Sequence, residues 1–381
     1  MRIRRRDFVR GVGALTLAAC APATPPPAVS PTAAPAPGPT PAPSGKRILI
    51  LGGTGFAGPP IVRSAIARGH TVTLFNRGKT NPGLFPNVET ILGDRQTQLD
   101  LLRGRDWDAV VDTWAPGPTL VRRAAELLRD HVGHYLFLST ISVYKLGKDP
   151  IDESSPVLSL PPGVTVADIK KIDETVYGPL KVLAEQAAET AMPGRTTSVR
   201  SGVIAGPDDP TDRFVYWPLR MARGGEMIAP GAPDDPMQFI DARDLGAWMV
   251  TAIEGHATGV FNAVGPDVPR FGAVLDACKT AVGADPRFTW IPDDWLDKND
   301  AGGWGNFPLH VPAAADDSGF GRVSAARAIA HGLRFRSPVQ TARDALAWWN
   351  AQSPERRAQK RPGVEPEREA ALLETWHKAH G

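Results

Sequence analysis

The chain has 381 residues, of which 42% are hydrophobic, and this is enough to bury one large core or two smaller ones. Its 43 Lys and Arg residues nearly balance its 41 Asp and Glu residues. This balance disfavours nucleic acid as a partner, because proteins that bind phosphate backbones need clustered positive charge.

The first twenty residues have the layout of a targeting segment. Arg2, Arg4, Arg5 and Arg6 precede a short apolar run at residues 12–19. That run is shorter than the stretch of about 20 apolar residues that a transmembrane helix needs. We therefore interpret the segment as an address and exclude it from the predicted fold.

Two patterns in this segment specify the address. RRRDFVR resembles a twin-arginine export signal, and LAAC resembles a lipobox in which Cys20 becomes the lipidated first residue. Residues 21–45 are rich in proline and alanine and carry no charge, as in a tether. We expect export by the twin-arginine route and a lipoprotein on the periplasmic or extracytoplasmic face, touching the membrane only through its lipid. Cys278 then has no partner for an internal disulfide and is expected to be buried in a helix.

From residue 46 onward, short apolar strands alternate with helical patterns. This alternation is typical of an α/β fold, a doubly wound parallel sheet with helices on both faces. We predict two parts, at residues 46–200 and 201–381. The motifs described below assign the first to nucleotide binding, and the second is expected to be a smaller substrate lobe with C-terminal helices. The successive segments are KRILILG, IVRSAIARG, HTVTLFN, VETILG, WDAVVDT, TLVRRAAELLRDH and HYLFLST.

The first strand is followed by the glycine-rich sequence GGTGFAG at residues 52–58. Between a strand and a helix, such glycines allow a tight turn and let backbone amides receive a pyrophosphate. Pro59 and Pro60 lack amide protons, so the donors should lie nearer Gly55 and Phe56. A turn that merely joins strand to helix is the alternative. The predicted cofactor contacts are Gly52, Thr54, Gly55, Phe56, Ala57 and Gly58.

The end of the second strand, LFNRGK, should contact the ribose of a dinucleotide. An acidic residue there would accept a hydrogen bond from the 2′-hydroxyl, whereas Asn76 followed by Arg77 suits a 2′-phosphate. We therefore expect NADP in preference to NAD. After the third strand, GDR places Asp94 and Arg95 at the adenine end.

At this point the chain resembles the extended or atypical short-chain dehydrogenases/reductases, which include NAD-dependent epimerases and dehydratases. The segments that carry the resemblance are GGTGFAG, FNRG, GDR, FLSTISVYK, YGPLK, VRSGVIAGP and FIDARDLG. It implies catalytic roles for Thr140, with Ser139 as the other candidate, and for Tyr177 and Lys181, which would also contact the cofactor.

The spacing of Tyr177 and Lys181 has a physical reason. Residues four apart share one face of a helix, so a lysine ammonium near the phenol would lower the pKa of the tyrosine. Tyr177 could then exchange a proton with a substrate hydroxyl or carbonyl during hydride transfer. If Pro179 marks the first helical turn, however, Tyr177 lies just before the helix.

The remaining candidates are less specific. We expect Asp244 to be a structural carboxylate, and Arg200, Gln238 and Arg243 are possible substrate contacts. Three tryptophans could stack on a sugar or simply pack in the core. They are Trp290, Trp295 and Trp304. Residues 331–350 are expected to form a strand and an amphipathic helix, followed by a second helix near the C-terminus.

Three functions compete. The first is an exported NAD(P)-dependent oxidoreductase or epimerase acting on a small, sugar-like substrate through Thr140, Tyr177 and Lys181. No metal is expected, and a homodimer is the oligomeric state we consider. The second is a non-catalytic nucleotide-binding or RNA-binding protein, because chloroplast stem-loop-binding proteins resemble this branch. The third is a structural lipoprotein that retains a cofactor. Export favours a cofactor that is bound before translocation and regenerated within each cycle.

Overall fold

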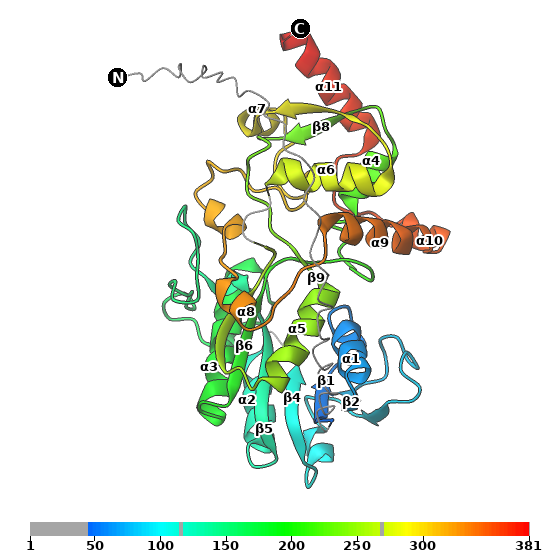
Figure 1. The fold of residues 1–381 in the computed structure, drawn as a ribbon. Coiled ribbons are helices and arrows are strands. Elements are labelled where there is room, and N and C mark those ends of the chain that lie inside the picture. Colours follow the sequence, from blue (N-terminus) through cyan, green and yellow to red (C-terminus); the bar gives the residue numbers. More distant parts are fainter. Residues whose placement is uncertain (1–44, 114–116, 267–269, 381) are drawn as a thin grey trace, which may run out of the picture. The chain divides into compact units, whose positions relative to one another are not determined.

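A seven-stranded parallel sheet forms the centre of the fold (Figure 1). The computed structural model describes residues 45–113, 117–266 and 270–380. The strand order is β10-β6-β5-β4-β1-β2-β3, which reverses direction between β1 and β4. The strands are β1 (Arg47–Leu51), β2 (Thr71–Asn76), β3 (Glu89–Leu92), β4 (Trp107–Asp112), β5 (Val132–Thr140), β6 (Thr196–Ser201) and β10 (Gly259–Ala263). The predicted doubly wound α/β fold is confirmed.

The side chains of β1 alternate between two apolar layers. Ile48 and Ile50 pack with α1 (Gly58–Ala67) and α5 (Ala242–Glu254), and Leu49 and Leu51 pack with α2 (Pro118–Leu128) and α3 (Glu174–Ala191). A strand that is apolar on both faces is expected in a parallel sheet covered by helices on both sides. The helices thus hold the carboxyl ends of β1 and β4 at the point where the strand order reverses.

The C-terminal part has a core of its own, which packs helices around a two-stranded parallel sheet. Cys278 is fully buried in this core on a helix, as predicted. The elements are α4 (Tyr216–Ala222), β8 (Glu226–Pro230), α6 (Phe271–Val282), β11 (Arg287–Ile291), α7 (Asp293–Lys298), α9 (Pro338–Asn350), α10 (Pro354–Arg357) and α11 (Pro366–His380). The predicted helix within residues 331–350 is α9. Residues 331–337, which precede α9 and were expected to form a strand, form none.

The central sheet extends beyond the boundary predicted at residue 200. The chain leaves the sheet after β6 and pairs β7 (Ile204–Ala205) with β9 (Ile240–Asp241). It then returns through α5, and β10 pairs with β6 as the seventh strand. The part of the chain that forms the central sheet therefore includes residues beyond 240, because they complete this sheet and one of its helical layers.

The predicted targeting segment, its lipidation site Cys20 and most of the tether lie outside the described residues. In the part of the chain that the structure describes, no helix has both the length and the apolar character required to cross a membrane.

Candidate functional site

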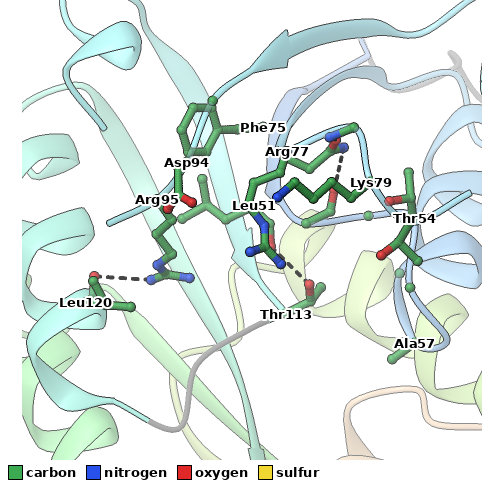
Figure 2. Close-up of a pocket in the computed structure, with 18 of the residues that line it drawn as sticks. Leu51, Thr54, Ala57, Phe75, Arg77, Lys79, Asp94, Arg95, Thr113 and Leu120 are labelled. Atoms are coloured by element: carbon green, nitrogen blue, oxygen red, sulfur yellow. Dashed lines mark hydrogen bonds between the residues drawn. The ribbon is translucent and has the colours of Figure 1, made fainter. Parts of the chain in front are cut away.

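A cavity of about 320 Å³ opens at the carboxyl ends of β1, β2 and β3 (Figure 2). Ligands of open α/β sheets bind at such an edge, where the strand order reverses. Every residue predicted to bind the cofactor from the first three strands lines this cavity, whereas Tyr177 and Lys181 do not. The lining residues that were predicted are Gly52, Thr54, Gly55, Phe56, Ala57, Gly58, Asn76, Arg77, Asp94 and Arg95.

The glycine loop leaves amides free at the head of α1. A Cβ on Gly58 would lie 2.6 Å from the backbone of Gly53, so only glycine allows this close approach. The Gly58 amide donates to Gly55 O at 3.2 Å, and the two prolines follow it in the first turn. Among the described residues, the amides of Phe56 and Ala57 have no acceptor. The loop therefore fits a pyrophosphate, since it offers donors at a helix N-terminus.

Asn76 braces the loops at the end of β2. Its amide nitrogen donates to Gly52 O at 3.1 Å, and its Oδ1 accepts from the Gly78 amide at 2.8 Å. Arg77 and Lys79 beside it are exposed at the cavity. Lys79 was not among the predicted residues, although it follows in the same LFNRGK segment.

Arg95 is already held by a buried carboxylate. Its guanidinium contacts both oxygens of Asp112 at 2.5 Å and donates to Leu120 O at 3.2 Å. Tyr135 also donates to Asp112, at 2.6 Å. Asp94, which precedes Arg95 in the chain, accepts a hydrogen bond from the Gln96 amide at 2.8 Å. Both predicted residues line the cavity, and Arg95 reaches it as a fixed ion pair.

Tyr177 lies inside α3, which corrects the possibility that it precedes the helix. Asp173 caps the helix by accepting hydrogen bonds from the amides of Thr175 and Val176, so the first turn begins before Tyr177. The next residue, Gly178, approaches the Ser142 carbonyl so closely that a Cβ would lie 2.2 Å from that oxygen. This approach brings the start of α3 against the end of β5.

Thr140, at the end of β5, is the residue whose hydroxyl forms a hydrogen bond with the phenol of Tyr177. Burial raises the pKa of Tyr177, and hydrogen bonding to Thr140 and the positive charge of Arg213 oppose that rise. The phenol is half-buried and neutral near pH 7. Arg213 was missed by the sequence analysis, because it belongs to a polar loop without a recognisable pattern.

Lys181 shares a helix with Tyr177, but its ammonium is bound elsewhere. It donates to Leu138 O at 2.9 Å and lies 4.6 Å from the centre of the Phe137 ring. Burial lowers the pKa of Lys181 to about 8, although Asp112 and Glu185 favour its charged form. The expected lowering of the Tyr177 pKa by Lys181 is therefore not found in this arrangement.

Ser139, the other hydroxyl candidate, belongs to a buried network. It donates to Glu185 Oε1 at 2.5 Å, and Arg200 pairs with the other oxygen of Glu185 at 2.7 Å. All three residues are buried, at 7% exposed or less. Arg200 is thus a structural partner of Glu185, and of the two hydroxyls only that of Thr140 acts on Tyr177.

The later candidates have structural partners. Asp244 accepts from the Arg336 amide and side chain at 2.9 and 2.8 Å, which confirms its structural role. Arg243 pairs with Asp241 and Asp344, and Gln238 exchanges hydrogen bonds with the backbone of Val323. The predicted tryptophans pack against the C-terminal core, and none lines the cavity. They are Trp290, Trp295 and Trp304.

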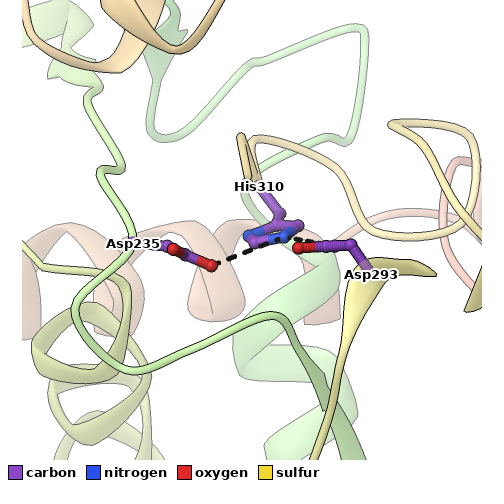
Figure 3. Close-up of side chains that lie close together, drawn as sticks. All are labelled: Asp235, Asp293 and His310. Atoms are coloured by element: carbon purple, nitrogen blue, oxygen red, sulfur yellow. Dashed lines mark hydrogen bonds and ion pairs between the residues drawn. The ribbon is translucent and has the colours of Figure 1, made fainter. Parts of the chain in front are cut away.

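A carboxylate and imidazole cluster lies in the C-terminal part (Figure 3). His310 Nε2 is 2.9 Å from Asp293 Oδ1 and 3.9 Å from Asp235 Oδ2. Its Nδ1 is buried and has no partner among the described residues. A histidine that ligates a metal usually donates its other N–H to a fixed acceptor. The contacts are those of a hydrogen-bonded cluster that joins two loops to the start of α7.

No protein-family model matches the chain. It is 28% identical over 261 residues to the epimerase family protein SDR39U1 of Bos taurus, covering 65% of this chain and 83% of that protein.

This chain also aligns with solved structures of similar fold over nearly the whole length of those structures. WbmH of Bordetella bronchiseptica, in complex with NAD+, gives a TM-score of 0.58 at 18% identity over 80% of this chain and 98% of its own. The UDP-Glc/GlcNAc 4-epimerase of Campylobacter jejuni gives 0.59 at 16% identity over 80% and 99%. Human SDR39U1 with NADPH gives 0.52 at 20% identity over 79% and 99%.

Epimerase is the activity or family named for SDR39U1 and for the Campylobacter jejuni protein. The central parallel sheet with its flanking helices is the Rossmann-like α/β fold that the solved structures share with this chain.

Proposed function

We propose that the chain is an NAD(P)-dependent oxidoreductase or epimerase acting on a hydroxyl or carbonyl of a sugar-like substrate. The observation that carries the proposal is the glycine loop, which lines a cavity at the switch point of the sheet and keeps two amides without an acceptor among the described residues. It is supported by the complexes of two structural neighbours with NAD+ and NADPH, and by a third neighbour, which is a UDP-Glc/GlcNAc 4-epimerase.

In this proposal Tyr177 is the proton donor. Its pKa is raised by burial, so the phenol carries its proton near neutral pH and can give it to a substrate oxygen. Thr140 holds the phenol oxygen, and Arg213 stabilises negative charge that develops there. The bound nicotinamide would supply or accept the hydride. Lys181 would hold the nicotinamide ribose after its ammonium leaves the Leu138 carbonyl.

The test compares Tyr177→Phe with wild type. We expect Tyr177→Phe to bind NADPH normally but to lower the rate at which a keto sugar oxidises NADPH by about 100-fold or more, because that reaction requires a proton at the substrate oxygen. Tyr144→Phe is the matched control, because the Tyr144 phenol is buried against Asn262 and should not affect turnover. Retained activity in Tyr177→Phe would remove this residue from the mechanism, and a wild-type protein that binds neither nucleotide would refute the proposal.

We propose NADP as the preferred cofactor. Arg77 and Lys79 are exposed cations at the cavity, and Asn76 is neutral, so this end suits a 2′-phosphate better than a free 2′-hydroxyl.

We also propose that the chain is exported by the twin-arginine route and anchored through Cys20. A fold that must bind its nucleotide in the cytoplasm would then keep the cofactor through each cycle. Fractionation of cells expressing Arg5→Lys/Arg6→Lys and Cys20→Ser should show loss of export and loss of anchoring, respectively. Purified protein without nucleotide, with an affinity for NADP of about 1 μM or weaker, would contradict cofactor retention.

A further inference from the structure

A second cavity, of about 170 Å³, lies in the C-terminal part and shares no lining residue with the glycine-loop cavity. It is formed by α4 and by the segment that leads into α11. Its volume is below the range of about 300–1,000 Å³ that is typical of sites for whole organic ligands. It therefore suits a small ion or a single group of a larger molecule.

Three arginines line this second cavity, and only Arg220 is fully paired. Arg220 Nε contacts Glu369 at 2.6 Å, and its other nitrogens donate to the carbonyls of Gly224 and Glu226. The remaining oxygen of Glu369 accepts from the Ile228 amide at 3.1 Å. Glu369 is thus committed to Arg220 and to the backbone of β8.

The other two arginines, Arg223 and Arg361, keep unbalanced charge. Arg223 is 3.6 Å from Glu369, and its side chain is 39% exposed. Arg361 lies over the Trp349 ring at 5.2 Å and has no carboxylate partner in the described ranges. Burial lowers the pKa of Arg223, and its neighbours Arg220 and Arg361 lower it further. With Glu365 as the only acid among the lining residues, positive charge is in excess.

A buried hydroxyl completes the lining. Tyr216 is 4% exposed, and its OH has no hydrogen-bond partner among the described residues. Burial and the nearby Glu369 carboxylate raise the pKa of Tyr216, so the phenol is neutral and its O–H is a donor that lacks an acceptor among the described residues. An unsatisfied buried donor is costly, and an acceptor in the cavity would relieve that cost.

The segment 364–366 that lines the second cavity leads into α11, which has 15 residues. The N-terminal end of a helix carries partial positive charge, which adds to the field of the arginines.

We propose that this second cavity binds an oxyanion of the phosphate class, held between Arg223 and Arg361 and hydrogen bonded by Tyr216. The two cations supply charge-assisted hydrogen bonds, and the phenol supplies a neutral one. The anion can be free phosphate or the phosphate group of an organic monoester. This proposal does not depend on the proposed hydride-transfer reaction.

The test is a calorimetric titration of the full chain with inorganic phosphate. We expect saturable binding that weakens by about tenfold or more in Arg223→Gln/Arg361→Gln. Arg343→Gln is the matched control, because Arg343 is exposed on α9 in the same part of the molecule. Phosphate that occupied the glycine loop instead would bind the double variant as well as wild type, and that result would overturn the proposal, as would absence of binding.

Two further variants separate binding from folding. Tyr216→Phe keeps the ring and removes only the hydroxyl, so it should weaken phosphate binding several-fold without changing the circular dichroism spectrum. Arg361→Lys keeps the charge and should retain most of the affinity. Unchanged binding in Tyr216→Phe would contradict the role of the phenol. Glycerol phosphate that binds at least as tightly as inorganic phosphate would identify a monoester as the source, and weaker binding would identify the free ion.

Discussion

The two ends of the candidate active site are built from different parts of the chain. At the glycine-loop end, backbone amides and a close helix approach form the cavity, and they depend on the shape of the turn. At the Tyr177 end, side chains from β5, α3 and a distant loop must meet, and Lys181 is bound to a backbone carbonyl. The first end is fixed by the fold, whereas the second depends on side-chain positions that a ligand can change.

The largest effect is expected from breaking the backbone-built end. Gly58→Val would force side-chain atoms into the backbone of Gly53, which cannot move without displacing the loop. We expect NADP affinity to fall by about 100-fold or more and stability to fall by about 1–3 kcal/mol. Isothermal titration and urea unfolding measure the two effects. Gly55→Ala is the control for folding, since a Cβ there meets no atom within 4 Å. Normal NADP affinity in Gly58→Val would show that the close approach is dispensable.

The stability of the fold is expected to depend on pH through His134, which lies on β5 with Thr140. This dependence must be separated from any pH dependence of the reaction at Tyr177. Burial lowers the pKa of His134 to about 3 from an ordinary value of 6.5. The unfolded chain then binds more protons between these values, so stability present above pH 6.5 is lost as the pH falls toward 3. Between pH 6.5 and pH 4 the loss is on the order of 3 kcal/mol.

Denaturant titrations between pH 7 and pH 4 should show a smaller loss of stability in His134→Gln than in wild type. His380→Gln, at an exposed position of α11, should behave like wild type. Equal pH dependence in His134→Gln and wild type would mean that His134 is not the titrating group.

At the side-chain-built end, Lys181→Met should affect function more than folding. Asp112 and Glu185 each have an arginine partner, so removing the ammonium leaves no carboxylate without a cation. Replacing a buried charge with an apolar chain is often neutral or stabilising. We expect unchanged or increased stability and a turnover about 100-fold lower. Lys360→Met, at an exposed position, is the control. A loss of several kcal/mol in Lys181→Met would instead make Lys181 a structural cation.

The smallest effect is expected from an exposed cation at the cavity. Arg77→Ala should reduce the preference for NADP over NAD by about tenfold, because one charge-assisted contact to the 2′-phosphate would be lost. The comparison needs both dissociation constants, with Arg122→Ala on α2 as an exposed control. An unchanged NADP to NAD ratio would mean that Arg77 does not contact the phosphate.

The sequence predicted the parts of the molecule that depend on local backbone geometry. GGTGFAG, between an apolar strand and a helix, indicated both the turn and the cavity, and the apolar runs indicated the sheet. The start of α3 was not predicted from the position of Pro179, because the helix begins after its capping residue Asp173, five residues before Gly178. A proline can lie in the second turn when a cap outside it fixes the first.

What the sequence did not predict depends on contacts between distant segments. The choice between Ser139 and Thr140 follows from Glu185 and Arg200, which bind Ser139 from another helix and strand. The direction of the Tyr177 pKa shift follows from burial and from where the Lys181 ammonium lies. The spacing of two residues on a helix specifies a shared face but not the partners that their polar groups find.

The late return of β10 to the sheet has a consequence for folding. Because β6 is not covered until residues 259–263 arrive, a fragment ending near residue 200 would expose the unpaired edge of β6. The central sheet is therefore completed only through a contact between segments far apart in the chain, which is slow to form. Truncation at the boundary predicted from the sequence should yield an aggregating fragment, whereas a chain that includes α5 and β10 retains both neighbours of β6.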